Sequence, residues 1–425
     1  MKDIILMHIG DIHFKNIIKM DMPINIVDTQ ESLNVIDRNI HVSRNKYEII
    51  SESLLAEIQN STVAILISGD LTTNGEVESY NDCLDFLKSR IDSEFLDSEC
   101  FQKLFLVPGN HDIDRKKIDD NDYIPKFEPM IDALQTKNFP DVPCDDIMVE
   151  KICEEDSFSK LLVISVNSCI GCGENKYFPP EIRDHLTPLL TDYEVMDTPL
   201  IANDHIDKMI EAIMENNDFL PLILTHHNLL PLKRTNYVTI HADLINSGIL
   251  REKLLMLNKP ILYLHGHIHD DPIEIIQSPN YEKSKIICIS APLLFPIEKI
   301  RGSPKFGFNK IRIISGNSSP IGCEIISYRL INNKVEKISK RIPFFCPPKS
   351  MALITDDDEF VLGMLEDNTN LYFNKVASKI RKSGQNIEDE ELIDILERLS
   401  WLGLIEYGDD DDDIKMRCMK RLVPK

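Results

Sequence analysis

The sequence predicts an α/β fold, because short apolar runs that suit buried strands alternate with stretches whose apolar residues recur at helical spacing. Several of these apolar runs end in motifs that carry polar side chains. The chain has 425 residues and a hydrophobic fraction of 43%, which is ordinary for a globular protein. This length suits one large domain followed by a small one.

Five strand-like runs are each followed by a short polar motif. The runs are Lys2–Ile9, Val63–Ser68, Leu104–Val107, Leu222–Leu224 and Pro260–Leu264. In the same order, the motifs are Asp11-Ile12-His13, Gly69-Asp70, Gly109-Asn110-His111-Asp112, Thr225-His226-His227 and Gly266-His267-Ile268-His269. Loops at the carboxyl ends of strands in an α/β sheet converge on one crevice, so these motifs can meet although they lie far apart in sequence.

The motifs contain the side chains that divalent metals prefer. Residues two apart in an extended chain project to one side, so Asp11 with His13, and His267 with His269, can bind metal as pairs. Imidazole suits zinc, iron and manganese, whereas carboxylate and carbonyl oxygen suit manganese and magnesium, so the mixed set leaves the metal identity open. We therefore expect two divalent metal ions, chosen among Mn, Fe and Zn, and we favour Mn.

The ordered motifs resemble those of the calcineurin-like metallophosphoesterase superfamily, and the resemblance extends over roughly residues 1–345. It implies a fold of two mixed sheets packed face to face and flanked by helices. It also implies a dinuclear metal site with one bridging carboxylate. In that site Asp11, His13 and His269 bind one metal, Asn110, His226 and His267 bind the other, and Asp70 bridges both.

By the same resemblance, the protein hydrolyses phosphate esters. A hydroxide that bridges the two metals is the expected nucleophile, while both ions neutralise charge on the phosphoryl oxygens. The resemblance places His111 beside the leaving group, where its imidazole can act as a general acid. Asp112 is a candidate for orienting His111.

Two motifs favour a phosphodiester as the substrate. Serine/threonine protein phosphatases of this superfamily carry an arginine in the second motif and GNHE in the third. This chain has GDLTTNG at Gly69–Gly75 and GNHD instead, so it lacks that bidentate phosphate clamp. A protein phosphatase is therefore not expected. The GDLTTNG form and the THHN form at Thr225–Asn228 look more like the phosphodiesterase branch of the superfamily, and this resemblance implies a phosphodiesterase that acts on a nucleotide or nucleic acid. The alternatives are a phosphomonoesterase of the same superfamily and a regulatory or assembly subunit with a vestigial metal site.

Two further residues are candidates for binding the substrate. His227 follows the expected ligand His226, and it either contacts substrate or only lines the pocket. Arg115 begins a short basic run just beyond the third motif. The net charge of −23 argues against a nuclease that binds duplex DNA without help, because such binding depends on neutralising phosphates.

The ten cysteines are scattered along the chain, and Cys169 and Cys172 form the only closely spaced pair. Since a second pair is missing, the spacing does not predict a structural zinc site. No apolar stretch is long enough to cross a membrane, and the N-terminus does not have the layout of a signal peptide. We expect a cytoplasmic protein with reduced thiols and no membrane contact.

The remaining elements are less strongly marked. A long insertion at Asp114–Lys160 and an irregular stretch at Lys15–Arg44 leave from metal-bearing loops, so they could wall the pocket. The expected helices are Phe127–Leu134, Asp145–Glu155, Asn203–Glu215 and Ala242–Leu257. The expected strands are Leu161–Val166, Lys285–Ser290, Phe308–Ile314 and Cys323–Leu330, of which the last three would complete the second sheet. A linker at Phe344–Ser350 then ends the large domain.

Residues 351–425 predict a second domain that resembles a winged helix. Three helices are expected at Phe360–Glu366, Leu371–Lys382 and Asp389–Leu402, followed by a hairpin of Gly403–Tyr407 and Ile414–Leu422. Here Asp and Glu outnumber Lys and Arg by 18 to 10, and five aspartates occupy the expected wing. Duplex phosphates would be repelled by that tip, so we expect the domain to bind a protein partner. A solvated appendage without a partner is the alternative.

Overall fold

The computed structural model describes most of the chain. The described residues are 3–14, 49–58, 63–90, 103–119, 121–153, 159–174, 176, 197–231, 243–295, 305–316, 319–345, 353–365, 371–407 and 418–422. The expected irregular stretch Lys15–Arg44 and the acidic turn at residues 408–413 lie outside them, as do residues 346–350 of the expected linker. Among the described residues, no helix has the length and apolar character needed to cross a bilayer. The cytoplasmic location stays a prediction.

The first sheet of the described residues has six strands in the order β12-β11-β10-β1-β2-β3. Its central strand β1 pairs in parallel with β2 and antiparallel with β10. β2 in turn pairs in parallel with β3, so β1, β2 and β3 end at the same edge of the sheet. The strands are β1 (Ile4–Ile9), β2 (Ala64–Ile67), β3 (Leu104–Leu106), β10 (Gly307–Ser315), β11 (Pro320–Ile331) and β12 (Lys334–Pro343).

The second described sheet also has six strands, in the order β4-β5-β6-β7-β9-β8. Strands β5, β6, β7 and β9 run in parallel, and the edge strands β4 and β8 are antiparallel to their neighbours. The strands are β4 (Met148–Cys153), β5 (Lys160–Ser165), β6 (Leu220–Leu224), β7 (Pro260–His265), β8 (Ile273–Ser278) and β9 (Tyr281–Ser290). Strands β6 and β7 therefore end at a common edge, as β1, β2 and β3 do.

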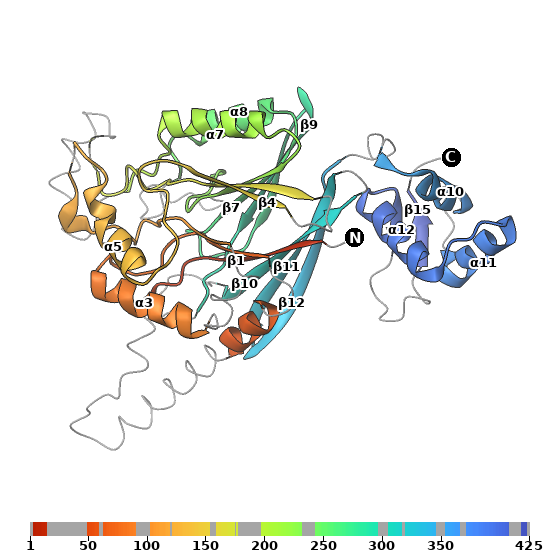
Figure 1. Cartoon of the computed structure of the whole chain (residues 1–425), viewed down its shortest axis with the longest axis horizontal. Coiled ribbons are helices and arrows are strands. Elements are labelled where there is room, and N and C mark those ends of the chain that lie inside the picture. The colour runs from red at the N-terminus through yellow and green to blue at the C-terminus, as the bar shows by residue number, and fades with distance from the viewer. Residues whose placement is uncertain are drawn as a thin grey trace, which may run out of the picture.

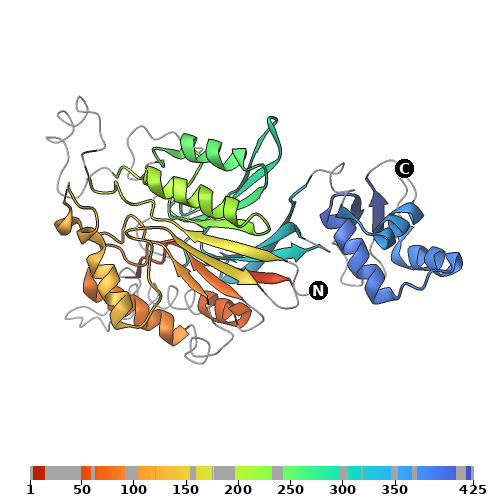
Figure 2. The same cartoon turned by 45° about the horizontal axis from the view of Figure 1, so that its top comes forward.

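The two sheets pack face to face through one apolar core. Ile4 and Leu6 of β1 share that core with Leu222 and Leu224 of β6. Because residues alternate between the two faces of a strand, the neighbours of these residues face the flanking helices instead. The predicted sandwich of two mixed sheets is thereby confirmed (Figure 2).

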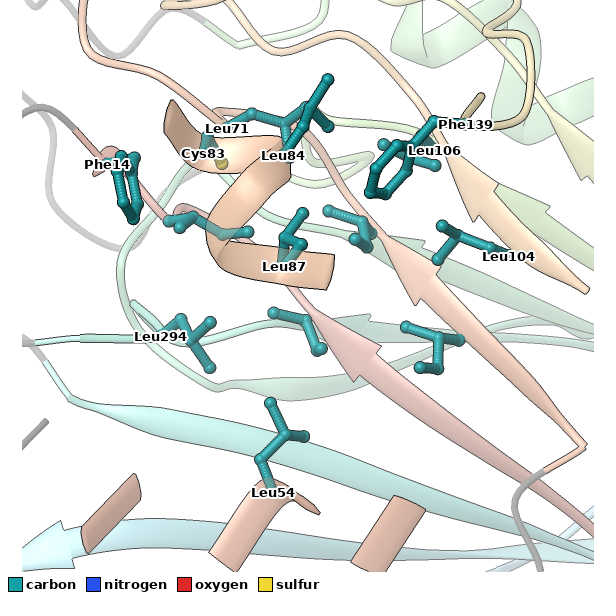
Figure 3. Close-up of a cluster of buried hydrophobic side chains, with 14 of the residues drawn as sticks. Phe14, Leu54, Leu71, Cys83, Leu84, Leu87, Leu104, Leu106, Phe139 and Leu294 are labelled. Carbon is teal, nitrogen blue, oxygen red and sulfur yellow. The ribbon is translucent and has the colours of Figure 1, made fainter. Parts of the chain in front are cut away.

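Helices cover the outer faces of both sheets. α3 (Val77–Arg90), α5 (Glu128–Thr136) and the helical segment 49–58 lie against the first sheet. Figure 3 shows Leu84 and Leu87 of α3 packed over side chains from the strands of the first sheet. α7 (Asn203–Glu215) and α8 (Ser247–Met256) cover the second sheet (Figure 1). The buried face of α7 carries Ile206, Met209 and Ile213, which is the spacing of an amphipathic helix.

Two sequence-based assignments are wrong. The helix expected at Asp145–Glu155 is strand β4, which pairs along its whole length with β5. The spacing of Met148, Val149 and Ile152 fits a short helix as well as a strand, and the long-range pairing decides between them. The strands that were expected to complete the second sheet are divided, because only β9 joins it while β10 and β11 join the first sheet. Strands β8 and β12 were not predicted.

The C-terminal segment forms three described helices and a small sheet, and their apolar core also includes Ile314 of β10 and Ile321 of β11. The helices are α10 (Asp356–Met364), α11 (Phe373–Ser383) and α12 (Asp389–Trp401), and the strands are β13 (Leu371–Tyr372), β14 (Ile405–Tyr407) and β15 (Cys418–Arg421) in the order β13-β15-β14. The predicted order of three helices and a hairpin is confirmed, with β13 as an added strand. The winged-helix likeness and the division into two domains stay predictions.

Candidate metal centre

The first and fifth motifs lie side by side although more than two hundred residues separate them. Asp11, His13, Asp70 and His269 each offer a ligand atom, and these atoms lie within 4.8 Å of one another. Nε2 of His269 is 3.6 Å from Oδ1 of Asp11 and 3.2 Å from Nε2 of His13. This cluster contains the three residues predicted for one metal, together with the predicted bridge.

A second cluster joins the third, fourth and fifth motifs. Oδ1 of Asn110 is 2.9 Å from Nε2 of His226 and 3.2 Å from Nδ1 of His267. All three side chains are buried. These are the residues predicted for the other metal.

The carboxylate of Asp70 lies between the two clusters. Its Oδ2 is 3.6 Å from Nε2 of His13 in the first cluster and 3.5 Å from Nε2 of His226 in the second. Its Oδ1 accepts a hydrogen bond of 2.8 Å from the backbone N–H of His111, which fixes the carboxylate. This position is the one that a bridging ligand would occupy.

Backbone strain is concentrated at the same residues. Nine non-glycine residues of the described chain have a positive φ, and five of them are the expected ligands Asp11, His13, Asp70, His267 and His269. Such left-handed conformations cost free energy for residues with a Cβ, and they persist where the surrounding structure enforces them. A Cβ at Gly109 would lie 2.1 Å from Oδ1 of Asp70, so only glycine lets the third motif approach this carboxylate.

The hydrogen bonds of His226 and Asn110 test whether the cluster fits a cation. Nδ1 of His226 is 2.7 Å from the carbonyl oxygen of Ser68, which can only accept, so the ring proton is on Nδ1. Burial lowers the pKa of His226 to about 4, so Nε2 holds a lone pair near neutral pH. Nδ2 of Asn110 donates to Asp197, so Oδ1 faces Nε2 at 2.9 Å. Two acceptors that face each other at this distance fit a shared cation.

The buried carboxylates of the site also favour bound cations. Burial and the charge of Asp70 raise the pKa of Asp11 well above its usual value. Close carboxylates repel each other in a buried site, and divalent cations would reverse that repulsion. The donor set therefore fits two divalent metals.

His111 lies at the margin of the two clusters. Its ring is 4.9 Å from that of His13, centroid to centroid, and it is only partly buried. Its Nδ1 is 3.0 Å from the carbonyl oxygen of Thr73, so Nδ1 carries a proton and the opposite nitrogen can exchange one. This arrangement suits a residue that donates a proton through Nε2.

Asp112 does not take the role that its sequence position suggested. Its carboxylate accepts hydrogen bonds from the backbone N–H groups of Leu71, Thr72 and Gly109, at 3.0 to 3.1 Å. It therefore ties the second and third motifs together. Burial, followed by the charge of Asp70, raises the pKa of Asp112 to about 6.

The family model for calcineurin-like phosphoesterases matches residues 5–271 of the chain. The chain belongs to this family. The matched region contains all five motifs. It ends at residue 271, whereas the resemblance was expected to extend to residue 345. No curated protein matches the chain.

Several solved structures are similar to this phosphoesterase, at low identity. A dimetal phosphatase from Danio rerio is 10% identical over 80% of this chain and 99% of its own, with a TM-score of 0.44. Vacuolar protein sorting 29 from Cryptosporidium parvum is 10% identical over 80% of this chain and 98% of its own, with a TM-score of 0.32. The Entamoeba histolytica protein of that name, as a single mutant, is 11% identical over 80% of this chain and 99% of its own, with a TM-score of 0.30. Likenesses this distant carry no argument about the substrate.

Sequence reasoning missed Asp197 of this phosphoesterase. Asp197 is buried, and Oδ2 accepts a bond of 3.0 Å from Nδ2 of Asn110. Nη2 of Arg115 lies 3.1 Å from both oxygens of Asp197, and the N–H of Gly173 donates to Oδ1. Asp197 belongs to none of the five motifs, so no sequence signal marks it. The predicted contact of Arg115 with substrate stays a prediction.

His227 lies beside the expected ligands His226 and His267, and the ligand atoms of the three side chains lie within 4.8 Å of one another. Its side chain is buried, its ring is 4.5 Å from that of His267, and its Nδ1 is 2.9 Å from Oγ of Ser168. Of the two neighbouring histidines, His226 is the one whose Nε2 lies beside Asp70 and Asn110. A substrate contact by His227 stays a prediction.

Proposed function

We propose that this protein is a dinuclear metal-dependent phosphodiesterase. The observation that carries the proposal is the pair of acceptors that face each other at 2.9 Å, Nε2 of His226 and Oδ1 of Asn110, beside the shared carboxylate of Asp70. Asp11, His13 and His269 would hold one ion, Asn110, His226 and His267 the other, and Asp70 both. Manganese is the first metal to test, because the set mixes imidazole with carboxylate and amide oxygen.

Two divalent cations held there would supply Lewis acidity to the phosphoryl oxygens and lower the pKa of a water molecule. The chain contributes the fixed geometry. The hydrogen bond from the His111 N–H fixes Asp70, and the Asp112 carboxylate holds the loops that carry both residues. Such a preorganised site need not rearrange its ligands when a substrate binds.

His111 would protonate the leaving oxygen of the ester. Its Nδ1 proton is held by the carbonyl oxygen of Thr73, so the protonated ring presents its second proton from Nε2. The T-shaped contact with His13 places the ring beside the first cluster. General acid catalysis of this kind contributes about 10²- to 10⁴-fold to the rate.

The side chains that follow Asp70 support a diester over a monoester. Leu71 is buried in the apolar core, Oγ1 of Thr72 contacts the Asp112 carboxylate, and Oγ1 of Thr73 donates to the carbonyl oxygen of His13. None of these three side chains is cationic. A monoester carries more negative charge than a diester, so it depends more on an added cation such as an arginine clamp. A nucleotide or nucleic acid is the diester class that we propose.

The competing account is a regulatory or assembly subunit whose metal site has no catalytic role. A scaffold needs neither the shared carboxylate nor the strained backbone at Asp11, His13 and His267. Such strain costs free energy of folding, and it is typical of functional sites. It therefore favours a working metal centre over a scaffold.

A substrate screen tests the proposal. Manganese-loaded protein is assayed on cyclic nucleotides, single- and double-stranded DNA, RNA, an aryl phosphodiester and the matching monoester. We expect manganese-dependent cleavage of diesters and little activity on the monoester. Activity on monoesters alone would overturn the diester assignment, and bound metal with no turnover on any ester would favour the regulatory subunit.

A further inference from the structure

Three buried side chains that are not among the seven ligands proposed for the dinuclear centre could hold another metal ion. Cys169, Cys172 and His227 each offer one ligand atom, and these atoms lie within 4.8 Å of one another. All three side chains have 0% exposure. The two cysteines are free thiols in the structure.

The backbone turns both cysteines toward the same space. The N–H of Cys172 donates to the carbonyl oxygen of Cys169 at 3.0 Å, which closes a tight turn, and Gly173 follows with a φ of 78°. Buried Lys126 donates to the carbonyl oxygens of Ile170 and Cys172 and so holds the turn from behind. A Cys-x-x-Cys pair in a turn is the usual half of a structural zinc site.

His227 supplies a third ligand, which the spacing of the two cysteines alone did not predict. Its Nδ1 is 3.9 Å from Sγ of Cys169. In a tetrahedral zinc site, ordinary zinc–sulfur and zinc–nitrogen bond lengths place these two atoms about 3.6 Å apart, so a small closure suffices. Oxygen atoms that could complete four-coordination lie next to the ligands, since the carbonyl oxygen of Pro108 is 3.3 Å from Sγ of Cys169 and Oγ of Ser168 is 2.9 Å from Nδ1.

We propose that Cys169, Cys172 and His227 bind a structural zinc ion that is distinct from the two catalytic metals. Two thiolates and a neutral imidazole around Zn²⁺ form a cluster with no net charge, which is compatible with full burial. Thiolate ligands also select zinc over manganese, so this site and the dinuclear centre would take different metals.

Zinc would have to compete with protons for the two thiols. Burial raises the pKa of both Cys169 and Cys172, so without a cation the two groups are protonated. Zinc binding would displace those protons.

The ion would connect the turn at residues 169–173 to the loop that follows β6. That turn donates to Asp197 through Gly173, and the loop carries the expected ligand His226. The zinc ion would therefore stabilise one wall of the metal centre without taking part in hydrolysis. This role goes beyond the proposed function and does not depend on it.

The test uses full-length protein, expressed with added zinc and purified under reducing conditions. The zinc-edge X-ray absorption spectrum of the wild type should show sulfur neighbours at about 2.3 Å. The variant Cys172→Ser should lose one zinc ion per chain by elemental analysis. Cys144→Ser is the matched control, because Cys144 is buried in the same apolar cluster and is not one of the three ligands, and it should keep that zinc.

Three results would overturn the proposal. They are a wild-type spectrum without sulfur neighbours, an unchanged zinc content in Cys172→Ser, and a disulfide between Cys169 and Cys172 in the freshly purified protein. If Cys172→Ser does not fold, the wild-type spectrum decides alone. None of these readouts measures phosphodiesterase activity, so failure here is distinguishable from failure of the proposed function.

Discussion

Nδ2 of Asn110 donates a hydrogen bond of 3.0 Å to Oδ2 of Asp197, and this bond determines which side of the amide faces the metal-ligand cluster. Asp197 is in turn held by Nη2 of Arg115 and the N–H of Gly173. The orientation of one expected ligand thus depends on a residue that is not itself one of the seven expected ligands.

Replacing Asp197 with alanine should therefore weaken metal binding. Without its acceptor, the amide of Asn110 can rotate and turn its nitrogen toward the cation. Loss of a partner that orients a metal ligand commonly costs about 10- to 100-fold in affinity or activity. Manganese titration of the Asp197→Ala variant measures the change. Asp218→Ala is the control, because that exposed carboxylate pairs only with Lys160 in the described structure, and equal weakening in both variants would refute the orienting role.

Replacing His111 with asparagine should slow hydrolysis in a way that depends on the leaving group. A poor leaving group such as a nucleoside alkoxide needs the proton, so its kcat should fall by about 10²- to 10⁴-fold. A good leaving group such as p-nitrophenolate should be affected much less. Steady-state kinetics with both classes of diester, at equal metal content, measure the difference, and an equal loss for both would argue against a general acid.

Glu57 makes the stability of the first sheet depend on pH. Partial burial would raise its pKa, but hydrogen bonds from Lys310, Tyr328 and Lys337 outweigh that effect and lower the pKa from 4.5 to about 2. Because the folded protein has the lower pKa, the stabilisation is fully present above about pH 4.5 and is lost as the pH falls toward 2.

Urea unfolding of the wild type and Glu57→Gln should therefore differ near neutral pH and converge as the pH is lowered through this range. Glu52→Gln is the control, because Glu52 is an exposed residue of the same helical segment. A difference that grows at lower pH would contradict the assignment.

The C-terminal segment offers a comparison of two arginine–aspartate pairs. Nε of Arg398 donates to both oxygens of Asp358, whose side chain is fully buried, whereas the pair of Arg381 with Asp389 is exposed. Breaking a buried pair leaves an uncompensated charge and costs about 3 kcal/mol or more, while exposed pairs contribute little. Arg398→Met should therefore destabilise this segment strongly, and Arg381→Met should not.

Trp401 provides the measurement, because it is the only tryptophan of the chain and is buried in the C-terminal core. Its fluorescence during urea unfolding reports on this segment and on its packing against Gly322 of β11 and Arg341 of β12. Similar unfolding midpoints for the two variants would show that the buried pair does not stabilise it.

The strand ends and the polar motifs that follow them could be read from the sequence because both signals are local. An apolar run such as Leu104–Leu106 ends in glycine and polar residues, and the chemistry of those residues is visible without the fold. Family resemblance then separated His226 from His227. The structure places all seven expected ligands in two adjoining clusters.

Several features that the sequence did not reveal depend on contacts between distant parts of the chain. An apolar run identifies β10 as a strand, but only its pairing with β1 assigns it to the first sheet. In the same way, Cys169 and Cys172 form an incomplete zinc motif until the fold brings His227 beside them. Asp197 has no recognisable pattern at all, and its role is visible only through its bond to Asn110.

Anomalous diffraction from crystals grown with manganese tests the central claim most directly. The account predicts two peaks, one on either side of the Asp70 carboxylate, with Asp11, His13 and His269 around one and Asn110, His226 and His267 around the other. Crystals of Asp70→Ala should lose at least one peak while the fold is retained. Wild-type crystals with no peak at Asp70, or an Asp70→Ala protein that binds both ions as tightly as the wild type, would contradict the account.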